Sequence, residues 1–317
     1  MTTSRRRHGA GASNPPGGVA LSADAPSIDT ALKEAVDRHQ AGQLDQARML
    51  YGRILARVPD HADALHLSGI ADYQEGRLSP ALARFRAVLA AHPAFAAAYN
   101  SLGNALADEG HLDAAVAAYR RAIALDDGYA EAFGNLGTVF QSLGRYDDAL
   151  TAYGEAIRLD PRRIGARHNL GVLHQIMGRL DHAAVCFHEV VKAAPDHAAA
   201  WRGLALALRA LRHPDAEVCL RRALADTPAD AELALELGML LNEQRHYEEA
   251  EAALRPAAEA DPMRAPLQFA LGGALQGQNR FAEAVACFRR TVGAEPLLSG
   301  AWNNLGVLEM RAGNIEA

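Results

Sequence analysis

Apolar residues recur every three or four positions over most of the chain, and this spacing predicts helices. Phe133, Leu136 and Phe140, for example, fall at i, i+3 and i+7 and so share one face of a helix. Gly144 ends this pattern in a position suited to a C-cap, because glycine adopts a positive φ at little cost. A second amphipathic stretch then runs up to Pro161, which cannot continue a helix interior. The segment is therefore predicted to form two helices joined by a short turn.

The two-helix pattern repeats with a period of 34 residues, which separates Gly103 from Gly137 and Tyr119 from Tyr153. A fixed period of this length is typical of a solenoid. The small residue at Gly137 indicates that the two helices cross closely there, beside a ring whose burial is worth roughly 1.5 to 3 kcal/mol. The register predicts units 28–61, 62–95, 96–129, 130–163, 164–197, 198–230, 231–264 and 265–298, and a partial unit 299–317.

A few places depart from the regular pattern. In the first unit Ala35 stands where most units have the glycine of Leu-Gly, and a more polar first helix suits a terminal cap. One later unit is a residue short, and we expect the deletion at Leu211–Pro214, with Pro214 at the first position of the next helix. Pro256 lies inside a predicted helix and predicts a kink or an early end. The last unit stops at the entry to its second helix, so we expect the sequence to be a fragment of a longer chain.

The order of marked positions carries a family resemblance. In unit 130–163 these positions are Phe133, Leu136, Gly137, Gly144, Ala149, Tyr153, Ala156 and Pro161. The order aromatic-x-x-Leu-Gly, Gly, Ala, aromatic, Ala, Pro resembles the tetratricopeptide repeat, and it recurs in phase over nearly everything after residue 27. The resemblance implies an all-α fold, a right-handed superhelix that stacks helix-turn-helix units into an α-solenoid. It also implies that the first helices line a concave groove that binds polypeptides.

Composition and charge narrow the choice of partner. Hydrophobic residues make up 50% of the chain, and the formal net charge is -6. Nucleic-acid-binding proteins normally present a basic stripe, so this acidic balance argues against a nucleic-acid partner. Residues 1–27 are rich in Gly, Ala, Ser and Pro and are predicted to be a disordered leader. No apolar run is long enough for a secretory signal or a membrane span, so we expect a cytoplasmic protein with no membrane partner.

Residues with catalytic or metal-binding potential form no recognised motif. The sequence has no phosphate-binding loop, nucleophile elbow, dinucleotide turn or HExxH. His182 and Cys186 could share a helix face, but His188 points elsewhere, which favours ordinary polar helix positions over a metal site. The three cysteines occupy the same place in their units and are expected to be free thiols in a reducing compartment. We expect no metal, no cofactor and no enzymatic activity within these residues.

Polar residues of the first helices, on the side away from the Leu-Gly face, are the candidate binding residues. An amide there offers one acceptor and two donors, which suits the backbone of an extended peptide. Arg202 and Arg209 would supply charge for an acidic partner. The alternative is that the asparagines are only solvated helix residues. The predicted peptide-binding set is Asn100, Ser101, Asn104, Asn135, Thr138, Gln141, His168, Asn169, Gln175, Arg202, Arg209 and Asn304.

Three of these asparagines carry a second resemblance. Asn135, Asn169 and Asn304 stand directly before Leu-Gly, and Ser101 is their polar equivalent. This run is similar to the asparagine ladder in the superhelix of O-linked N-acetylglucosamine transferases, which implies that the three asparagines hold a substrate or adaptor polypeptide. Other residue types interrupt the ladder in the units between Asn169 and Asn304. The carboxylate clamp of co-chaperone tetratricopeptide repeats is not matched, because its basic residues are missing.

The sequence leaves three functions open. The first is a protein interaction scaffold that binds an extended polypeptide in the groove. The second is the N-terminal substrate-recruiting arm of a glycosyltransferase like the O-linked N-acetylglucosamine transferases, with its catalytic domain beyond Ala317. The third is a scaffold for assembly or secretion. The identity of the protein or peptide partner, the oligomeric state and the pathway are not predicted by these residues.

Overall fold

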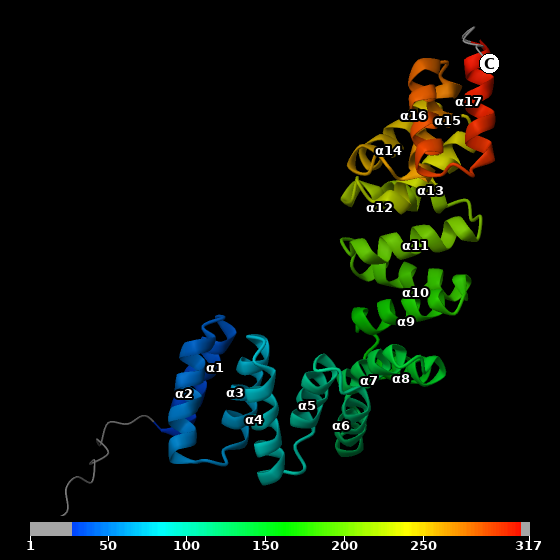
Figure 1. Ribbon diagram of the computed structural model, residues 1–317. Coiled ribbons are helices and arrows are strands. Elements are labelled where there is room, and N and C mark those ends of the chain that lie inside the picture. Colours follow the sequence, from blue (N-terminus) through cyan, green and yellow to red (C-terminus); the bar gives the residue numbers. More distant parts are fainter. Residues whose placement is uncertain (1–26, 312–317) are drawn as a thin grey trace, which may run out of the picture. The chain divides into compact units, whose positions relative to one another are not determined.

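The computed structural model of the chain describes residues 27–311, which form 17 α-helices and no strand (Figure 1). The predicted all-α architecture of repeated helix pairs is thereby confirmed. The described residues divide between Pro93 and Ala94 into two compact units. The first unit contains α1 to α4, and the second contains α5 to α17.

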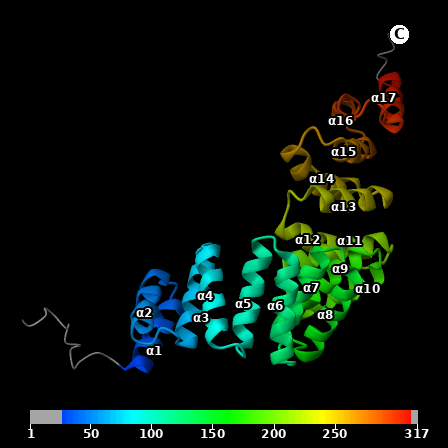
Figure 2. The same ribbon diagram turned by 60° about the horizontal axis from the view of Figure 1, so that its bottom comes forward.

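The odd-numbered helices are the first helices of each pair and the even-numbered ones are the second helices. The first helices are α1 (Ile28–Gln40), α3 (Ala62–Gln74), α5 (Ala96–Asp108), α7 (Ala130–Ser142), α9 (Ile164–Ile176), α11 (Ala198–Ala210), α13 (Ala231–Glu243), α15 (Ala265–Gly277) and α17 (Ser299–Arg311). The second helices are α2 (Leu44–Arg57), α4 (Leu78–Ala91), α6 (Leu112–Leu125), α8 (Tyr146–Leu159), α10 (Leu180–Ala193), α12 (Ala216–Asp226), α14 (Tyr247–Ala260) and α16 (Phe281–Ala294). Every first helix begins at the residue where the period places the start of a unit, and Figure 2 shows the helix pairs that make up each of the two compact units.

A residue with a left-handed backbone follows each first helix up to α15 and turns the chain toward the second helix. After α7, Gly144 has a φ of 72°, and the Arg145 N–H donates to the Phe140 carbonyl at 2.8 Å. This bond satisfies a carbonyl that the helix end would otherwise leave without a donor. In the last three of these turns the left-handed residue is not glycine, the φ values being 53° at Arg212, 65° at Arg245 and 63° at Asn279.

Rings of the second helices pack against glycines of the first helices. Tyr153 of α8 is fully buried, and a Cβ added at Gly137 of α7 would lie 2.7 Å from its ring. The Phe187 ring of α10 lies between two first helices, because a Cβ added at Gly171 or at Gly203 would lie 2.9 Å or 2.6 Å from it. Interiors are too densely packed for a ring to yield freely to an added carbon. The close helix crossing predicted at Gly137 is therefore present.

The shortened unit differs from the sequence expectation at its second helix. α12 begins at Ala216 rather than at Pro214, and the Ala216 N–H donates to the His213 carbonyl at 3.1 Å in a tight turn. The missing residue falls between Arg212, which keeps the left-handed position, and the buried Ala216. α12 has 11 residues, whereas α8 and the other second helices have 14, because residues 213–215 form the turn and not the first part of the helix.

Pro256 does not end its helix, so the early end expected from the sequence is wrong. α14 continues to Ala260, although a proline lacks the N–H that would donate to the Ala252 carbonyl. Residues on both sides of the proline, Leu254 and Ala257, are buried in the core. Their burial offsets the roughly 3 kcal/mol that an interior proline costs a helix.

The chain's first described helix is the least buried of the set. Ala35 is the one buried residue of α1, in line with its polar sequence. The Ser27 hydroxyl caps α1 by accepting from the Thr30 N–H at 3.1 Å. Apart from Ser27, the predicted leader lies outside the described residues, and so does the end of the partial unit at residues 312–317.

Candidate functional site

The predicted amides of α5 and α7 form a hydrogen-bonded bridge between two helix pairs. The Asn135 Nδ2 donates to the Oδ1 atoms of Asn100 and Asn104, each at 3.0 Å. The Tyr119 hydroxyl donates to the same Asn104 Oδ1 at 2.7 Å. Asn100 is only 3% exposed, and its Nδ2 donates to Glu131 at 3.1 Å. These amide donors therefore join neighbouring first helices instead of standing free for a ligand.

The same bridge recurs one unit later. The Asn169 Nδ2 of α9 donates to the Thr138 Oγ1 of α7 at 3.4 Å. The buried Tyr153 hydroxyl donates to Thr138 Oγ1 at 3.2 Å and to Gln141 Oε1 at 3.1 Å. The bridge is absent at the next unit of the described chain, where Gly203 stands in place of the asparagine and Val172 in place of the acceptor, and where Phe187 replaces the tyrosine. The expectation that the amides of Asn135 and Asn169 serve a peptide therefore needs correction: the Asn135 Nδ2 makes two hydrogen bonds within the chain, and the Asn169 Nδ2 makes one.

The remaining predicted residues of α5 and α9 are partly buried. Ser101 and Gln175 are half-exposed at the surface of α5 and α9. His168 packs on the ring of Phe187 at 5.6 Å and lies 4.9 Å from His197, between ring centroids. Burial lowers the pKa of His168. A hydrogen bond in which the Asn169 Oδ1 accepts from the His168 ring raises this pKa, and the neighbouring His197 lowers it.

Arg202 and Arg209 are paired with acids of α13 and of its N-cap, Asp230. The Arg202 Nε lies 3.0 Å from Asp230 Oδ2, and its Nη2 also contacts the Glu232 carboxylate. The Arg209 guanidinium lies 3.2 Å from Glu236 and 3.2 Å from Glu243. Four carboxylates thus meet two guanidinium groups, which leaves a net charge of -2. This contradicts the expectation that these arginines attract an acidic partner, because the cluster they belong to is itself acidic.

Beyond this cluster, three successive first helices and the turn between α16 and α17 line an open cavity of about 400 Å³, which we call the α13–α17 pocket. This volume is in the range of small-ligand sites. Most of its wall is apolar, its polar groups are two amides and two carboxylates, and no Lys or Arg lines it. The lining residues are Leu235, Met239, Asn242, Glu243, Pro266, Phe269, Ala270, Gly273, Glu295, Leu298 and Asn304.

The two amides of the pocket differ in what they bond to. The Asn242 Nδ2 donates to the Ala270 carbonyl at 2.9 Å and so joins α13 to α15, while its Oδ1 is buried without a donor. The side chain of Asn304 makes no hydrogen bond to another residue of the described ranges. Among the three predicted asparagines of the ladder, Asn304 is therefore the one that both lines a cavity and makes no side-chain hydrogen bond within the described residues.

The pocket occupies the repeat positions at which polar binding residues were predicted. Leu235 and Phe269 take the place in their helices that Asn100 has in α5, and Met239 takes the place of Asn104. The binding set predicted from the sequence contains only polar and charged residues, so it leaves out these three apolar ones. The available signal was a second apolar face on α13 and α15. Phe269 of this face also packs on Phe288 of α16, with the ring centroids 5.8 Å apart.

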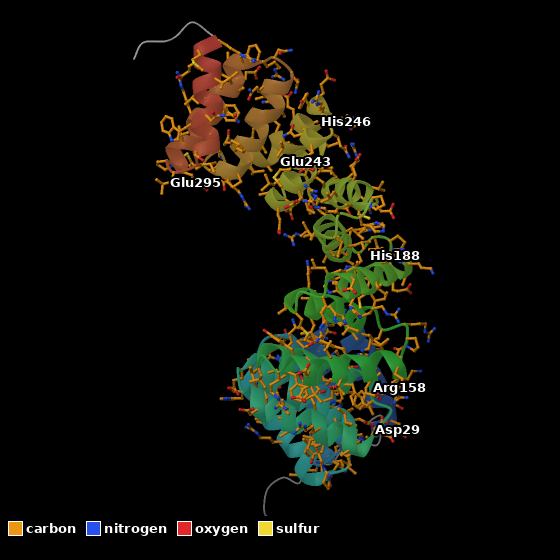
Figure 3. The ribbon with its side chains drawn as sticks, turned by 90° about the vertical axis from the view of Figure 1, so that its right-hand side faces the viewer. Asp29, Arg158, His188, Glu243, His246 and Glu295 are labelled. Atoms are coloured by element: carbon orange, nitrogen blue, oxygen red, sulfur yellow. The ribbon has the colours of Figure 1, made fainter. Side chains whose placement is uncertain are left out.

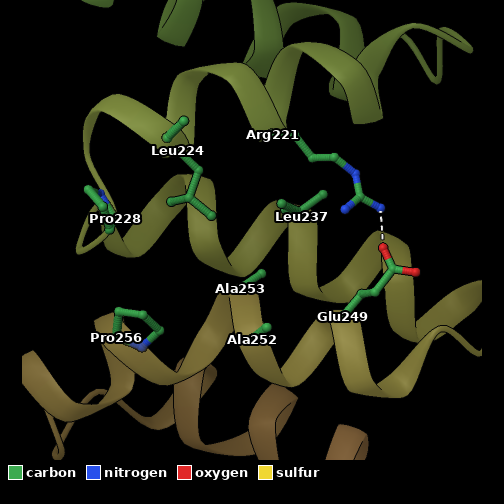
Figure 4. Close-up of a pocket in the computed structure, with 9 residues that line it drawn as sticks. Arg221, Leu224, Pro228, Leu237, Glu249, Ala252, Ala253 and Pro256 are labelled. Atoms are coloured by element: carbon green, nitrogen blue, oxygen red, sulfur yellow. Dashed lines mark hydrogen bonds and ion pairs between the residues drawn. The ribbon is translucent and has the colours of Figure 1, made fainter.

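A second cavity, of about 440 Å³, lies between α12, α13 and α14 (Figure 4). The side chains of Leu224, Leu237 and Pro256 line it, and the ion pair between Arg221 and Glu249, 2.6 Å apart, closes one end.

Other chemistry is sparse in the described part of the chain. Within residues 27–311 no group of three or more His, Cys, Asp or Glu side chains could hold a metal ion. His174 and His182 pack with ring centroids 5.1 Å apart, and Cys186 is a free thiol whose pKa is raised by burial. No described helix has the length and apolar character needed to cross a membrane.

Protein-family models match most of the chain. A model described as TPR repeat matches residues 103–144, and models described as tetratricopeptide repeat match residues 38–106, 130–163, 169–218, 206–265 and 269–317. All of these are repeat models, and they confirm the repeat predicted from the sequence. The comparison with curated proteins gave no match.

Two solved structures resemble this chain over most of their own length. YrrB, described as a TPR protein with an unusual peptide-binding site, is 20% identical, with a TM-score of 0.53 over 63% of this chain and 100% of YrrB. A tetratricopeptide repeat protein from Parabacteroides merdae is 18% identical, with a TM-score of 0.51 over 78% of this chain and 98% of its own. At these identities the likeness shows the fold, a solenoid of helix pairs.

Proposed function

Because the chain belongs to the tetratricopeptide repeat family, we propose that it is a protein interaction scaffold that binds an extended polypeptide along the first helices of residues 94–311. The observation that supports this function is the α13–α17 pocket. Three successive units contribute to it, on the face where binding residues were predicted, so a ligand there contacts several repeats at once. Extended chains suit such a row of sites, because their side chains and backbone groups recur at regular intervals.

The lining of the pocket suits binding rather than catalysis. Its apolar wall can bury a large side chain of a peptide, which is the main source of affinity in such sites. The amide of Asn304 can accept from and donate to the peptide backbone beside that side chain. The two lining carboxylates stand without a nucleophile among the lining residues.

A cavity-filling variant tests the proposed function without weakening the fold. A Cβ added at Gly273 would lie 3.8 Å from the nearest other atom, Asn242 Nδ2, so the Cβ of Gly273→Leu meets no clash, and Gly273 lines the pocket that the leucine is meant to fill. Leucine also favours a helix over glycine by about 0.8 kcal/mol. Short random peptides displayed on phage are selected on the immobilised chain, and the enriched peptides are synthesised and measured by fluorescence polarisation. We expect Gly273→Leu to weaken their binding by at least about tenfold, because the space for the side chain is filled.

The matched control is Gly154→Leu on α8, another helical glycine whose added Cβ meets nothing within 4 Å. This variant makes the same change of residue away from the pocket and is expected to bind like the original chain. A selection that enriches no peptide, or peptides that bind both variants equally well, would contradict the proposed function.

A further inference from the structure

We infer that the segment bound in the α13–α17 pocket is basic as well as apolar, with a large apolar side chain flanked by Lys or Arg. This inference rests on the proposed function and adds the chemistry of the partner. The sequence suggested the opposite charge, an acidic partner attracted by Arg202 and Arg209. The ion pairs of these two arginines reverse that expectation.

The apolar half of the inference follows from the walls of the pocket. Leu235, Met239, Phe269 and Leu298 line it, and Met239 is 36% exposed although it is a large apolar residue. Apolar surface gathered from three helices around one cavity is stabilised when another apolar group removes it from water. A leucine or an aromatic side chain of a partner supplies such a group and fits a cavity of about 400 Å³.

The basic half follows from the charges at the rim. Glu243 and Glu295 both line the pocket, and Figure 3 labels them among the side chains of the second unit. Glu295 is exposed and has no ion pair within residues 27–311. Glu243 shares Arg209 with Glu236, so one guanidinium serves two carboxylates.

This acidity extends past the pocket along the same face. Glu243 is also a member of the cluster between α11 and α13, in which four carboxylates meet two arginines. A peptide that lies across α13 from the pocket therefore passes over a net negative surface. Positive side chains next to the buried apolar one gain attraction there, and negative ones are repelled.

The uncommitted amide of Asn304 favours an extended segment over a helix. The backbone N–H and C=O groups of an extended chain are free to bond, whereas the interior of a helix has already used them. Asn304 lies on α17 at the opposite wall from Leu235 and Met239 of α13. A segment held between these walls can bury its side chain and bond its backbone to Asn304 together.

Three synthetic peptides test the partner's chemistry on the full chain. The first carries a central Leu-Phe pair flanked by lysines, the second has every lysine replaced by glutamate, and the third has the Leu-Phe pair replaced by Ala-Ala. Binding is measured by fluorescence polarisation at about 50 mM and at about 300 mM salt, because added salt screens charge attraction at exposed rims. We expect the first peptide to bind at least about tenfold more tightly than either of the others, and to lose several-fold in affinity at the higher salt. Equal binding of all three, or tighter binding of the glutamate peptide, would overturn the inference.

Two pairs of chain variants locate the effect. Glu295→Gln removes the unpaired carboxylate of the rim, and its control Glu248→Gln removes an exposed carboxylate of α14 that does not line the pocket. Asn304→Ala removes the amide, and its control Asn303→Ala changes the exposed neighbour. We expect each pocket variant to weaken the lysine peptide by about three- to tenfold, with the controls unchanged.

The outcomes separate this inference from the proposed function. Phage-selected peptides that Gly273→Leu blocks but that carry acidic or only polar residues would overturn the inference and leave the function standing. The absence of any bound peptide would overturn both. A dimer of the chain that Gly273→Leu dissociates would mean that a second copy fills the pocket, which also overturns the inference.

Discussion

The packing of rings on glycines predicts a specific cost for adding one carbon atom. In Gly137→Ala the new Cβ would lie 2.7 Å from Cδ1, 2.8 Å from Cε1 and 3.1 Å from Cγ of Tyr153. Tyr153 is fully buried, and its hydroxyl is hydrogen-bonded to two residues of α7, Thr138 and Gln141. The ring is therefore held at both ends and cannot rotate away without losing those bonds.

Two opposing effects set the size of the change. Replacing a helical glycine by alanine stabilises a helix by about 0.5 to 1 kcal/mol. Forcing an extra carbon into a packed core costs about 1 to 3 kcal/mol. We expect Gly137→Ala to lower the free energy of unfolding by about 1 kcal/mol, because the clash exceeds the gain in helix propensity. At Gly154 an added Cβ meets nothing within 4 Å, so Gly154→Ala gains helix propensity without a clash and should raise the free energy of unfolding.

Urea unfolding followed by circular dichroism measures both variants on the whole chain. The two are expected to differ by about 2 kcal/mol, which is a large fraction of the stability of a typical domain. A Gly137→Ala chain that is as stable as Gly154→Ala would refute the reasoning. A second test is the same alanine change in a Tyr153→Leu background, where it should cost less. The chain itself contains such a combination, with Ala205 at the glycine position and Leu220 at the ring position of one unit.

Three further outcomes follow from local features. Arg245→Gly should raise the free energy of unfolding by about 0.5 kcal/mol in urea titrations, because it relieves a left-handed φ of 65°, whereas Arg245→Ala should not. Tyr153→Phe should lower the thermal midpoint by an amount equivalent to about 1 kcal/mol, because the bonds from its hydroxyl are lost. Burial lowers the pKa of His168 and of His174, so the folded state disfavours their protonated forms. The free energy of unfolding should then fall as the pH drops below about 6.5. The double variant His168→Gln/His174→Gln should lose less of this free energy than the original chain between about pH 7.5 and about pH 5.5.

The helices could be predicted from the sequence because the features that set them are local. Gly144 has the positive φ expected of it, and the small residue at Gly137 packs on a ring as its place in the repeat indicated. Pro256 could not be judged in the same way. Whether a proline ends a helix depends on the burial of the residues beyond it, such as Ala257, and that burial comes from other helices.

The candidate site was predicted less completely. The pattern along one helix shows which residues share a face, but it does not show which residues of other helices lie next to that face. The positions of Asn135 and Arg202 on the first-helix face were predicted, but their partners lie about one repeat away in the sequence. Because of those partners, the Asn135 amide joins two helices, and the positive charge of Arg202 belongs to a cluster that is acidic as a whole. Leu235 and Phe269 were missed for the opposite reason, because an apolar residue on a helix is ordinarily assigned to the core.

The asparagine bridges also constrain how this repeat array can change in evolution. Asn135 and Asn169 each donate to a residue 31 positions earlier, on the preceding first helix. A unit duplicated or inserted between α7 and α9 would separate Asn169 from Thr138, and it must then bring its own oxygen acceptor to that place. Without one, the exposed amide loses a hydrogen bond whose net contribution is about 0.5 to 1.5 kcal/mol. A gain or loss of a unit between α5 and α9 must thus preserve these hydrogen bonds as well as the 34-residue period if the bridges are to be kept.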